Sequence, residues 1–331
     1  MRIRFISDIH GALNMLYAPT EFTNIMKSKK PADVTLIAGD FDADIEEAKV
    51  TLNNYFANEL VVFIGGNHIV YNTRNLPLQK LLNEYKVTFD GQWKFLENDY
   101  IWLSKDIAVI GTIGWTDFLY GHQTKAEYVR DINREKAYRE KHKYGEDLFD
   151  STKQVPIIYG PLPDDPAAEY DELDMGNKPS YRSRRMRDAH RNMNDYNYGK
   201  YLRKNGEFDY LYPQDTYTMH KEALKEIKRC YNEIVAKNPN ATIILMTHHP
   251  FTKKCVVGRF KDDLLTPAFV SDHDKWLQKF PNIKYIHCGH VHSRFFEKLG
   301  DKQIICNPMG YLAYYENIQD KPFDINYILE I

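Results

Sequence analysis

The sequence predicts an α/β fold in which largely parallel strands alternate with helices. Short runs of β-branched and aromatic residues end abruptly in glycine or polar residues, which is typical of strands buried in a parallel sheet. Between the first of these runs lie two segments, 20–29 and 45–56, with apolar residues at helical spacing. Because strands alternate with helices, we expect a layered and mostly parallel sheet.

The strand-like runs lie in the two end portions of the chain. The N-terminal group comprises residues 4–6, 34–38, 60–64, 100–103 and 107–111. The C-terminal group comprises residues 242–246, 284–286, 303–306 and 325–329. A further helix is expected at 217–237, where apolar side chains share one side.

The middle of the chain breaks this pattern. Residues 115–215 are polar, rich in tyrosine and charge, and poor in long apolar runs. We interpret them as a partly helical insertion over a main domain formed by residues 1–114 and 216–331. The insertion contains a run of six carboxylates, Asp164, Asp165, Glu169, Asp171, Glu172 and Asp174, and a cluster of five arginines, Arg182, Arg184, Arg185, Arg187 and Arg191.

The composition is that of an ordinary globular protein. Of 331 residues, 43% are hydrophobic and 27% charged, and the net charge of −2 argues against a surface adapted to non-specific nucleic-acid binding. No apolar stretch is long enough for a membrane span, and the first residues read as a strand rather than a secretory signal. The four cysteines form no CxxC pair, so free thiols and a cytoplasmic location are expected.

Polar side chains with metal-binding chemistry follow several of the predicted strands. They are Asp8, His10, Asp40, Asn67, His248, His290 and His292. Because ligands of open α/β sheets lie beyond the carboxyl ends of the strands, we expect these seven side chains to meet along one edge. In Asp8-x-His10 and His290-x-His292, an extended backbone would point both side chains the same way.

The ligand types indicate the metal. Asp, Asn and His together suit divalent or trivalent transition metals such as Mn, Fe or Zn, whereas Ca²⁺ and Mg²⁺ prefer oxygen ligands alone. Seven ligands are too many for one catalytic ion with an open position. The sequence therefore predicts two metal ions that share a carboxylate.

These residues occur in five short blocks that resemble those of the calcineurin-like metallophosphoesterase superfamily. The blocks are Asp8-x-His10, Gly39-Asp40, Gly65-Gly66-Asn67-His68, His248-His249-Pro250 and Gly289-His290-Val291-His292, in the order of that family. The resemblance implies a layered α/β/β/α sandwich and a phosphoester hydrolase with two metal ions, Mn²⁺ first among them. The resemblance covers both ends of the chain and implies nothing about the structure or role of the insertion.

The resemblance also implies a role for each residue. Asp8, His10 and His292 would bind the first metal, Asn67, His248 and His290 the second, and Asp40 would bridge them. A hydroxide between the metals would attack phosphorus, and His68 would donate a proton to the leaving group as the general acid. His249, next to the family's usual His-x-Pro ligand, would support the site without binding metal.

Two departures from the family pattern bear on the substrate. Ile69 stands where the family often has a carboxylate after its Asn-His pair, which removes one group that could tune His68. Asp40 is not followed by the Asp-Arg-Gly of protein Ser/Thr phosphatases, which argues against a phosphoprotein substrate. A small-molecule or nucleotide phosphoester is therefore favoured.

Three alternatives remain open. A metal-free scaffold is disfavoured because no ligand type is missing. A nuclease or cyclic-nucleotide phosphodiesterase would use the arginine cluster to grip phosphates, unless those arginines form a solvated helix face neutralised by the acidic run. The segment 307–311, Asn-Pro-Met-Gly-Tyr, either contributes to the site or only forms a turn that closes the sheet.

Overall fold

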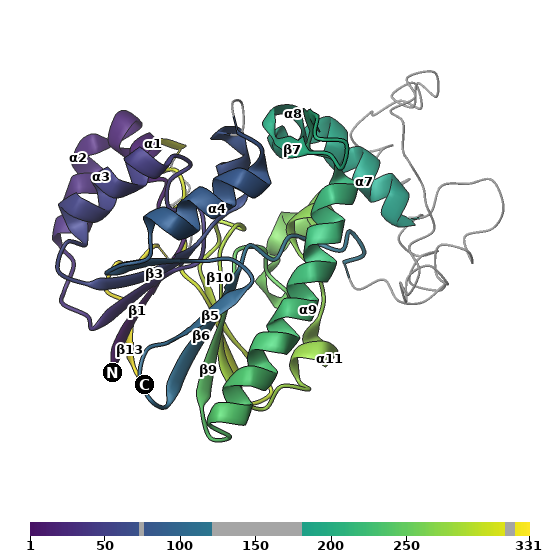
Figure 1. The fold of residues 1–331 in the computed structure, drawn as a ribbon. Coiled ribbons are helices and arrows are strands. Elements are labelled where there is room, and N and C mark those ends of the chain that lie inside the picture. Colours follow the sequence, from purple (N-terminus) through teal and green to yellow (C-terminus); the bar gives the residue numbers. More distant parts are fainter. Residues whose placement is uncertain (73–75, 121–180, 315–321) are drawn as a thin grey trace, which may run out of the picture.

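Two β-sheets packed face to face form the centre of the molecule, and helices cover their outer faces (Figure 1). The computed structural model describes residues 1–72, 76–120, 181–314 and 322–331. The two termini lie side by side, because the last strand pairs with the first and the Met1 amino group donates to the Ile331 carbonyl at 2.7 Å.

The first sheet has five strands in the order β13-β1-β2-β3-β4. Its strands are β1 (Arg2–Ile6), β2 (Val34–Ile37), β3 (Leu60–Ile64), β4 (Trp93–Leu96) and β13 (Ile328–Glu330). Strands β1 to β4 are parallel, and β13 pairs antiparallel with β1. The sequence predicted the last strand at 325–329, and the pairing register places it three residues later.

The second sheet has six strands in the order β11-β12-β10-β9-β6-β5. Its strands are β5 (Asp99–Trp102), β6 (Ile107–Thr112), β9 (Thr242–Thr247), β10 (Ile283–Cys288), β11 (Phe295–Leu299) and β12 (Lys302–Cys306). The four inner strands are parallel, and the two edge strands are antiparallel to their neighbours.

Alternate residues of the strands serve two different cores. Ile3, Phe5 and Leu36 of the first sheet pack against Ile244 and other residues of the second, in an apolar layer between the sheets. Their sequence neighbours, such as Ile6, face the helices on the outside of the first sheet. This period of two is the strand periodicity, and the resulting α/β/β/α arrangement of layers is the one expected.

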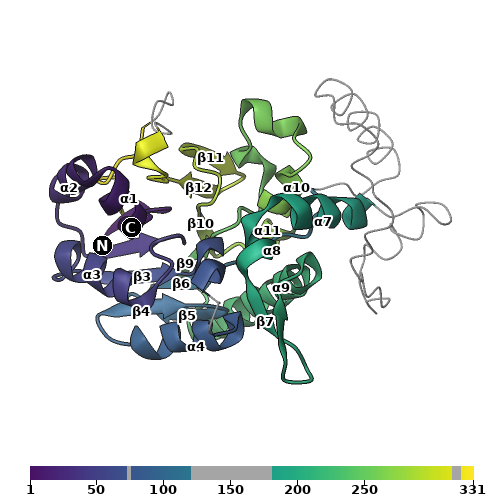
Figure 2. The same ribbon diagram turned by 90° about the horizontal axis from the view of Figure 1, so that it is seen from above.

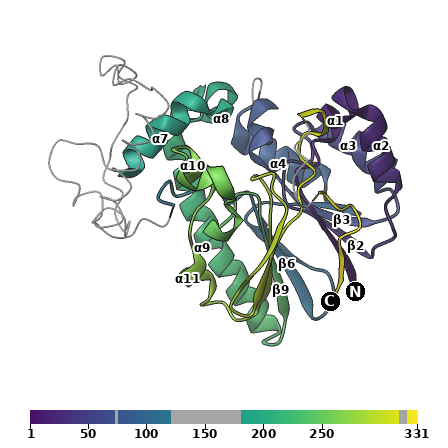
Figure 3. The same ribbon diagram turned by 180° about the vertical axis from the view of Figure 1, so that it is seen from behind.

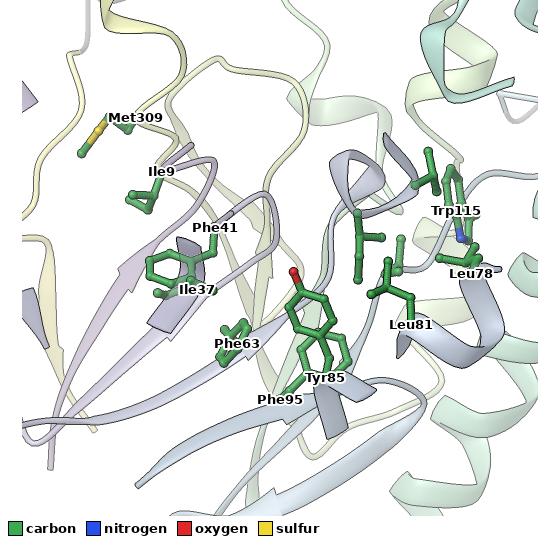
Figure 4. Close-up of a cluster of buried hydrophobic side chains, with 14 of the residues drawn as sticks. Ile9, Ile37, Phe41, Phe63, Leu78, Leu81, Tyr85, Phe95, Trp115 and Met309 are labelled. Atoms are coloured by element: carbon green, nitrogen blue, oxygen red, sulfur yellow. The ribbon is translucent and has the colours of Figure 1, made fainter. Parts of the chain in front are cut away.

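Helices cover the outer face of the first sheet and enclose a large apolar cluster. They are α1 (Gly11–Tyr17), α2 (Pro19–Lys27), α3 (Ile45–Tyr55) and α4 (Leu78–Thr88). Figure 4 shows part of this cluster, in which Phe63 lies near Tyr85 and Phe95. Helix α3 begins at Ile45 because the Asp44 side chain accepts the N–H groups of Glu46 and Glu47.

The outer face of the second sheet packs against the long helix α9 (Pro213–Lys237) and the short helix α11 (Asp274–Leu277) (Figure 3). Helix α9 starts four residues before the predicted position. Pro213 occupies its first turn, and the Asp215 side chain accepts the Tyr212 N–H at 2.8 Å, which stabilises the earlier start.

The described part of the predicted insertion is helical near its end. It comprises α7 (Tyr181–Asn192), α8 (Asn194–Tyr198) and a hairpin of β7 (Lys200–Leu202) and β8 (Phe208–Tyr210). Helices α7 and α8 lie beside α10 (Thr266–Phe269), above the strand ends (Figure 2). Met193 and Tyr196 join the same apolar cluster as the N-terminal helices. The boundaries at 115 and 215 stay a prediction.

Along the described ranges, every helix is too short or too polar to cross a membrane.

Candidate metal centre

All seven predicted ligands lie at the carboxyl ends of strands, on one edge of the two sheets. Asp8 and His10 follow β1, Asp40 follows β2, and Asn67 follows β3 as the first residue of the short helix η1 (Asn67–Asn72). From the other sheet, His248 follows β9, and His290 and His292 follow β10. The topology therefore brings together residues that are up to 284 positions apart in the chain.

Asp8, His10 and His292 form the first ligand group. The Nε2 atoms of His10 and His292 are 3.2 Å apart, and His292 Nε2 is 3.4 Å from Asp8 Oδ1. Asp8 Oδ1 also accepts the backbone N–H of His290 at 2.9 Å. Asp8 Oδ2 is buried and has no hydrogen-bond partner among the described residues, so this group contains an acceptor that no described donor satisfies.

Asn67, His248 and His290 form the second ligand group. Asn67 Oδ1 lies 3.0 Å from His248 Nε2 and 3.0 Å from His290 Nδ1. Asp40 stands between the two groups, because its Oδ2 is 3.3 Å from His248 Nε2 and 4.0 Å from His10 Nε2. This is the position expected of a carboxylate that bridges two ions.

The surroundings fix the orientation of His248. Its Nδ1 donates to the Ala38 carbonyl at 2.9 Å, which directs Nε2 toward Asp40 and Asn67. A ring N–H held by a carbonyl is the usual support of a metal-binding histidine. Burial disfavours the charged ring, but the Asp40 carboxylate outweighs burial and raises the pKa of His248 to about 9.

His249, next to His248, points elsewhere. Its ring stacks on Trp115 at a centroid distance of 5.0 Å and lies 4.2 Å from the ring of His290. Neither of its ring nitrogens has a hydrogen-bond partner in the part of the chain that the structure describes. Its place against His290 agrees with a supporting role, which stays a prediction.

The backbone of the centre is left-handed rather than extended. Asp8, His10, Asp40, His290 and His292 have φ values between 44° and 67°. The expectation that an extended backbone aligns the two Asp-x-His and His-x-His pairs is therefore wrong. Tight left-handed turns aim these side chains, and non-glycine residues keep such a conformation only where the surroundings impose it.

Three glycines let the chain come close to the ligands. A Cβ atom at Gly39 would lie 2.3 Å from His248 Nδ1, one at Gly66 would lie 1.9 Å from Asp40 Oδ1, and one at Gly289 would lie 2.6 Å from Asp8 Oδ2. Any side chain there would displace a ligand. Close packing against the predicted ligands thus explains why these positions are glycine.

Gly66→Ala is expected to lower the activity that the family resemblance implies about 100-fold, because a predicted ligand displaced by about 1 Å is misplaced for the reaction. It should also destabilise the fold by about 1–3 kcal/mol, as overpacking usually does. The matched control is Gly91→Ala, where a Cβ meets nothing within 4 Å. Steady-state kinetics and denaturant unfolding measure both effects. Equal behaviour of the two variants would contradict this account of Gly66.

The residues fit a pair of transition-metal ions. Asp8 Oδ2, an oxygen of one of the grouped carboxylates, is buried and has no partner in the described chain. Burial and the neighbouring histidines lower the pKa values of His10 and His290 far below the usual range, so both rings are neutral, which is the form that binds metal. A donor set of imidazole nitrogens, carboxylates and one amide oxygen suits Mn, Fe or Zn.

The segment 307–311 serves both of the functions left open by the sequence. The Asn307 side chain donates to the Phe5 carbonyl at 2.8 Å and accepts the Asp324 N–H at 3.2 Å, which closes the first sheet. Tyr311 reaches the centre: its hydroxyl is 2.8 Å from His68 Nε2, and its ring stacks on His10 at 4.5 Å.

Asp195, on α8, borders the centre and was not predicted. It is buried, lies 3.5 Å from the Tyr71 hydroxyl, and has the Asn67 side chain beside it. Burial raises the pKa of Asp195 to about 6. Nothing in the sequence around Asp195 marks it as a site residue.

Ile69, which replaces the carboxylate of the family pattern, is buried in the apolar cluster between the first sheet and the helices on its outer face. The carboxylate facing His68 is instead Asp40, whose Oδ2 is 3.8 Å from His68 Nε2. Burial lowers the pKa of His68, and Asp40 opposes this shift.

Two arginines of the cluster do not lie on a solvated helix face, whereas Arg191 is exposed and Arg187 is half-buried. Arg182 is buried, its Nε donates to the Asp117 carbonyl at 3.0 Å, and its guanidinium lies over the Tyr217 ring. Arg185 is also buried, with Nη1 3.2 Å from both the Leu264 carbonyl and Asp188. The interpretation is wrong for these two because both side chains are buried and their guanidinium groups contact neighbouring segments. The side chain of Arg184 and the acidic run at 164–174 lie outside the described residues.

A cavity of about 450 Å³ opens onto the centre. One wall is formed by polar residues of the centre: Asp40, Asn67, His68, His290, His292 and Tyr311. The other wall is largely apolar and includes Met193, Val256, Val257, Phe260, Leu265 and Phe269. The described lining contains no lysine or arginine, and its further acidic residues are Asp195 and Asp263.

Comparisons with known proteins bear on the family and the fold of this chain. Residues 1–188 match the family model described as calcineurin-like phosphoesterase. The comparison with curated protein sequences finds no relative. The crystal structure of phosphopantetheinyl hydrolase from Mycobacterium tuberculosis superimposes with a TM-score of 0.57 at 15% identity, covering 99% of this chain and 95% of that one. At this identity the likeness supports the fold alone.

A second solved structure, a proposed 5'-nucleotidase from Staphylococcus aureus in complex with alpha-ketoglutarate, has a TM-score of 0.40 at 12% identity. It covers 92% of this chain and 48% of that one. This similarity is too low to carry an argument.

Proposed function

Because this chain belongs to the calcineurin-like phosphoesterase family and is an enzyme that hydrolyses phosphoesters, we propose that it acts on a small phosphoester whose alcohol portion is uncharged and partly apolar. The observation that carries this proposal is the cavity beside the centre, which joins a polar wall of ligands to an apolar wall without lysine or arginine in its described lining. A substrate placed there would present one phosphoryl group to the centre and an apolar chain to the opposite wall.

We propose that the first ligand group and Asp40 hold one metal ion, and that the second ligand group and Asp40 hold another, with Mn²⁺ first and Fe or Zn as alternatives. Two ions bound there would supply Lewis-acid chemistry, which neutralises charge on phosphoryl oxygens and lowers the pKa of water to about 7. Asp40 balances positive charge on both sides, and the buried Asp195 lies beside Asn67.

His68 is proposed as the acid that protonates the departing alkoxide. Its side chain is 14% exposed and lines the cavity, so a leaving group in the cavity can reach it. The Tyr311 hydroxyl, 2.8 Å from His68 Nε2, restrains the ring, and Asp40 favours its protonated form. A positioned acid of this kind typically contributes about 10²–10⁴-fold to the rate.

The shape of the cavity supports a small substrate over a nucleic acid. Residues 192–195, between the end of α7 and the start of α8, line the cavity, so the described end of the predicted insertion encloses the site. Arg182 and Arg185, which would have gripped a phosphate backbone, are buried in contacts within the protein. Both observations weaken the nuclease alternative.

The test is a panel of phosphoesters with the Mn²⁺-loaded enzyme. It should include glycerol phosphate, 4'-phosphopantetheine, nucleoside monophosphates, cyclic nucleotides and short single-stranded oligonucleotides. Phosphopantetheine is a suitable first compound because its alcohol portion is a slender uncharged chain, and because phosphopantetheinyl hydrolase shares the fold. We expect the highest kcat/KM for esters with an uncharged chain. Preference for oligonucleotides, with salt-sensitive binding, would overturn the proposal and favour a nuclease.

Phe260→Ala is expected to raise KM for the preferred substrate about tenfold, because the apolar wall loses an aromatic ring while the reacting centre is untouched. Phe260 is 40% exposed and lines the cavity. Phe208→Ala is the matched control, since Phe208 is 52% exposed on β8, away from the cavity lining. A similar KM in both variants would place the alcohol portion of the substrate elsewhere.

A further inference from the structure

A second cluster of metal-type side chains lies outside the candidate metal centre. Asp117, His220 and His273 form it, and we call them the outer group; their ligand atoms all lie within 4.8 Å of one another. Asp117 follows β6, His220 belongs to α9, and His273 directly precedes α11. Three segments distant in sequence thus place a carboxylate and two imidazoles at one point.

The hydrogen bonds of His220 determine which ring nitrogen is free. Its Nδ1 lies 2.7 Å from the Gly114 carbonyl and 3.1 Å from the Trp115 carbonyl. Carbonyl oxygens only accept, so Nδ1 carries the hydrogen and Nε2 has a free lone pair.

The lone pair of His220 Nε2 faces the other two members. His273 Nε2 is 2.9 Å away, and Asp117 Oδ2 is 4.0 Å from His273 Nε2. The other carboxylate oxygen, Asp117 Oδ1, accepts the Leu119 N–H at 2.9 Å, and the Asp117 N–H donates to Ser271 Oγ at 2.9 Å. The first bond holds Oδ1 away from His273, and the second holds the backbone of Asp117 in place.

We propose that Asp117, His220 and His273 bind a third divalent transition-metal ion, of the zinc type. Three protein ligands of these kinds, with water at the remaining position, are a known form of zinc coordination. Metal-binding histidines usually donate their second ring N–H to a carbonyl or carboxylate, and His220 makes this contact. The Asp117 and His273 side chains are 13% and 15% exposed, so an ion and its water can reach the group.

The charges around the outer group are mixed. Asp272 and Asp274 flank His273 and favour positive charge there. Arg182 opposes it, but its Nε donates to the backbone carbonyl of Asp117 rather than to the carboxylate, and its guanidinium lies 4.3 Å from the Tyr217 ring centroid. The Arg182 guanidinium therefore leaves Asp117 Oδ2 available to a metal.

The outer group shares no residue with the candidate metal centre. The ring of Trp115 stacks on His249, and His249 in turn lies against His290, so aromatic rings separate the two. Loss of the outer ion should therefore leave the catalytic ions in place. The competing explanation is a structural hydrogen bond in which His273 Nε2–H donates to His220 Nε2, with no metal at all.

Metal stoichiometry distinguishes these explanations. The untagged full chain is stripped with chelator, dialysed against micromolar Zn²⁺, and analysed by mass spectrometry for zinc per chain. We expect three ions in the wild type and two in His273→Gln, whose side chain is partly exposed and should tolerate replacement. Asp117→Asn, which keeps the shape of the carboxylate, should also bind two. His190→Gln is the control with three ions, since His190 contacts only Tyr196 and Tyr212 rings among the described aromatic contacts.

Two results would overturn the proposal. Two ions in both the wild type and His273→Gln would mean that the histidines share only a hydrogen bond. Three ions in both would place the third ion elsewhere. In the Asp40→Asn background we expect the outer ion to remain and to disappear only with His273→Gln, which separates this test from that of the catalytic centre.

Discussion

Asp40→Asn is expected to remove most of the metal from the catalytic centre. Phosphoesterase activity should fall on the order of 10³-fold or more, because without metal the pKa of the attacking water is no longer lowered. Asp40 faces both ligand groups, with Oδ2 3.3 Å from His248 Nε2 and 4.0 Å from His10 Nε2. The backbone N–H of His68 donates to Asp40 Oδ1 at 3.0 Å. Asparagine has the same shape as aspartate and keeps an oxygen that can accept this hydrogen bond. The substitution therefore removes charge while preserving packing.

The measurements for Asp40→Asn are bound manganese per chain and initial rate on a nitrophenyl phosphate. Asp301→Asn is the matched control. Asp301 is exposed and, among the described residues, forms ion pairs with Lys284 and Lys302. Circular dichroism of both variants checks that the fold is intact. Full turnover in Asp40→Asn with wild-type metal content would refute the role given to Asp40.

His68→Ala is expected to keep both metal ions and to slow esters of poor leaving groups by about 10²–10⁴-fold, the usual contribution of a positioned acid. Nitrophenyl esters, whose leaving group needs no proton, should slow far less. The reason is the position of His68, whose ring lines the cavity and is 3.8 Å from Asp40 without belonging to either ligand group.

A series of aryl and alkyl phosphates measures this effect as the slope of log kcat against leaving-group pKa. The slope should become steeper in His68→Ala than in the wild type. Tyr311→Phe is a graded companion, because it removes only the hydroxyl 2.8 Å from His68 Nε2 and should give an intermediate slope. An unchanged slope in His68→Ala, or loss of metal, would show that His68 is not the acid.

Much of the fold was predictable because burial on both faces gives parallel strands an uninterrupted apolar signature. Strands such as β2 and β9 are short apolar runs that end at a glycine or a histidine, and these run ends also mark the carboxyl edge of the sheet. The segments without such a signature were harder. Helix α9 started earlier because of Pro213 and Asp215, and β13 was displaced because its position depends on pairing with β1.

The meeting of the seven predicted ligand residues at one edge was predictable, but the backbone conformation that directs them was not. Their spacing suggested extended backbone, whereas Asp8, His10 and His292 are in left-handed turns that only the full structure imposes. The glycines in the sequence blocks suggested that the backbone passes close to the predicted ligands. The structure explains this at Gly66, where a Cβ atom would clash with the Asp40 carboxylate. Local spacing does not encode a conformation that tertiary contacts hold in place.

Residues from the predicted insertion were the least predictable part of the site. Asp195 reaches Asn67 across more than a hundred positions of chain, and no local pattern distinguishes it from other polar residues of α8. Arg182 and Arg185 looked like a basic surface because charge in a sequence says nothing about packing. Because these two arginines are buried, we expect the residues that line the cavity, rather than surface charge, to select the substrate.

The central claim is that seven residues from the ends of five strands hold two metal ions. Anomalous diffraction at the manganese edge, from crystals grown with Mn²⁺, tests it most directly. We expect two peaks about 3.5–4 Å apart, one beside Asp8, His10 and His292, the other beside Asn67, His248 and His290, with Asp40 touching both. A single peak, or peaks at other residues with these seven left free, would contradict the account.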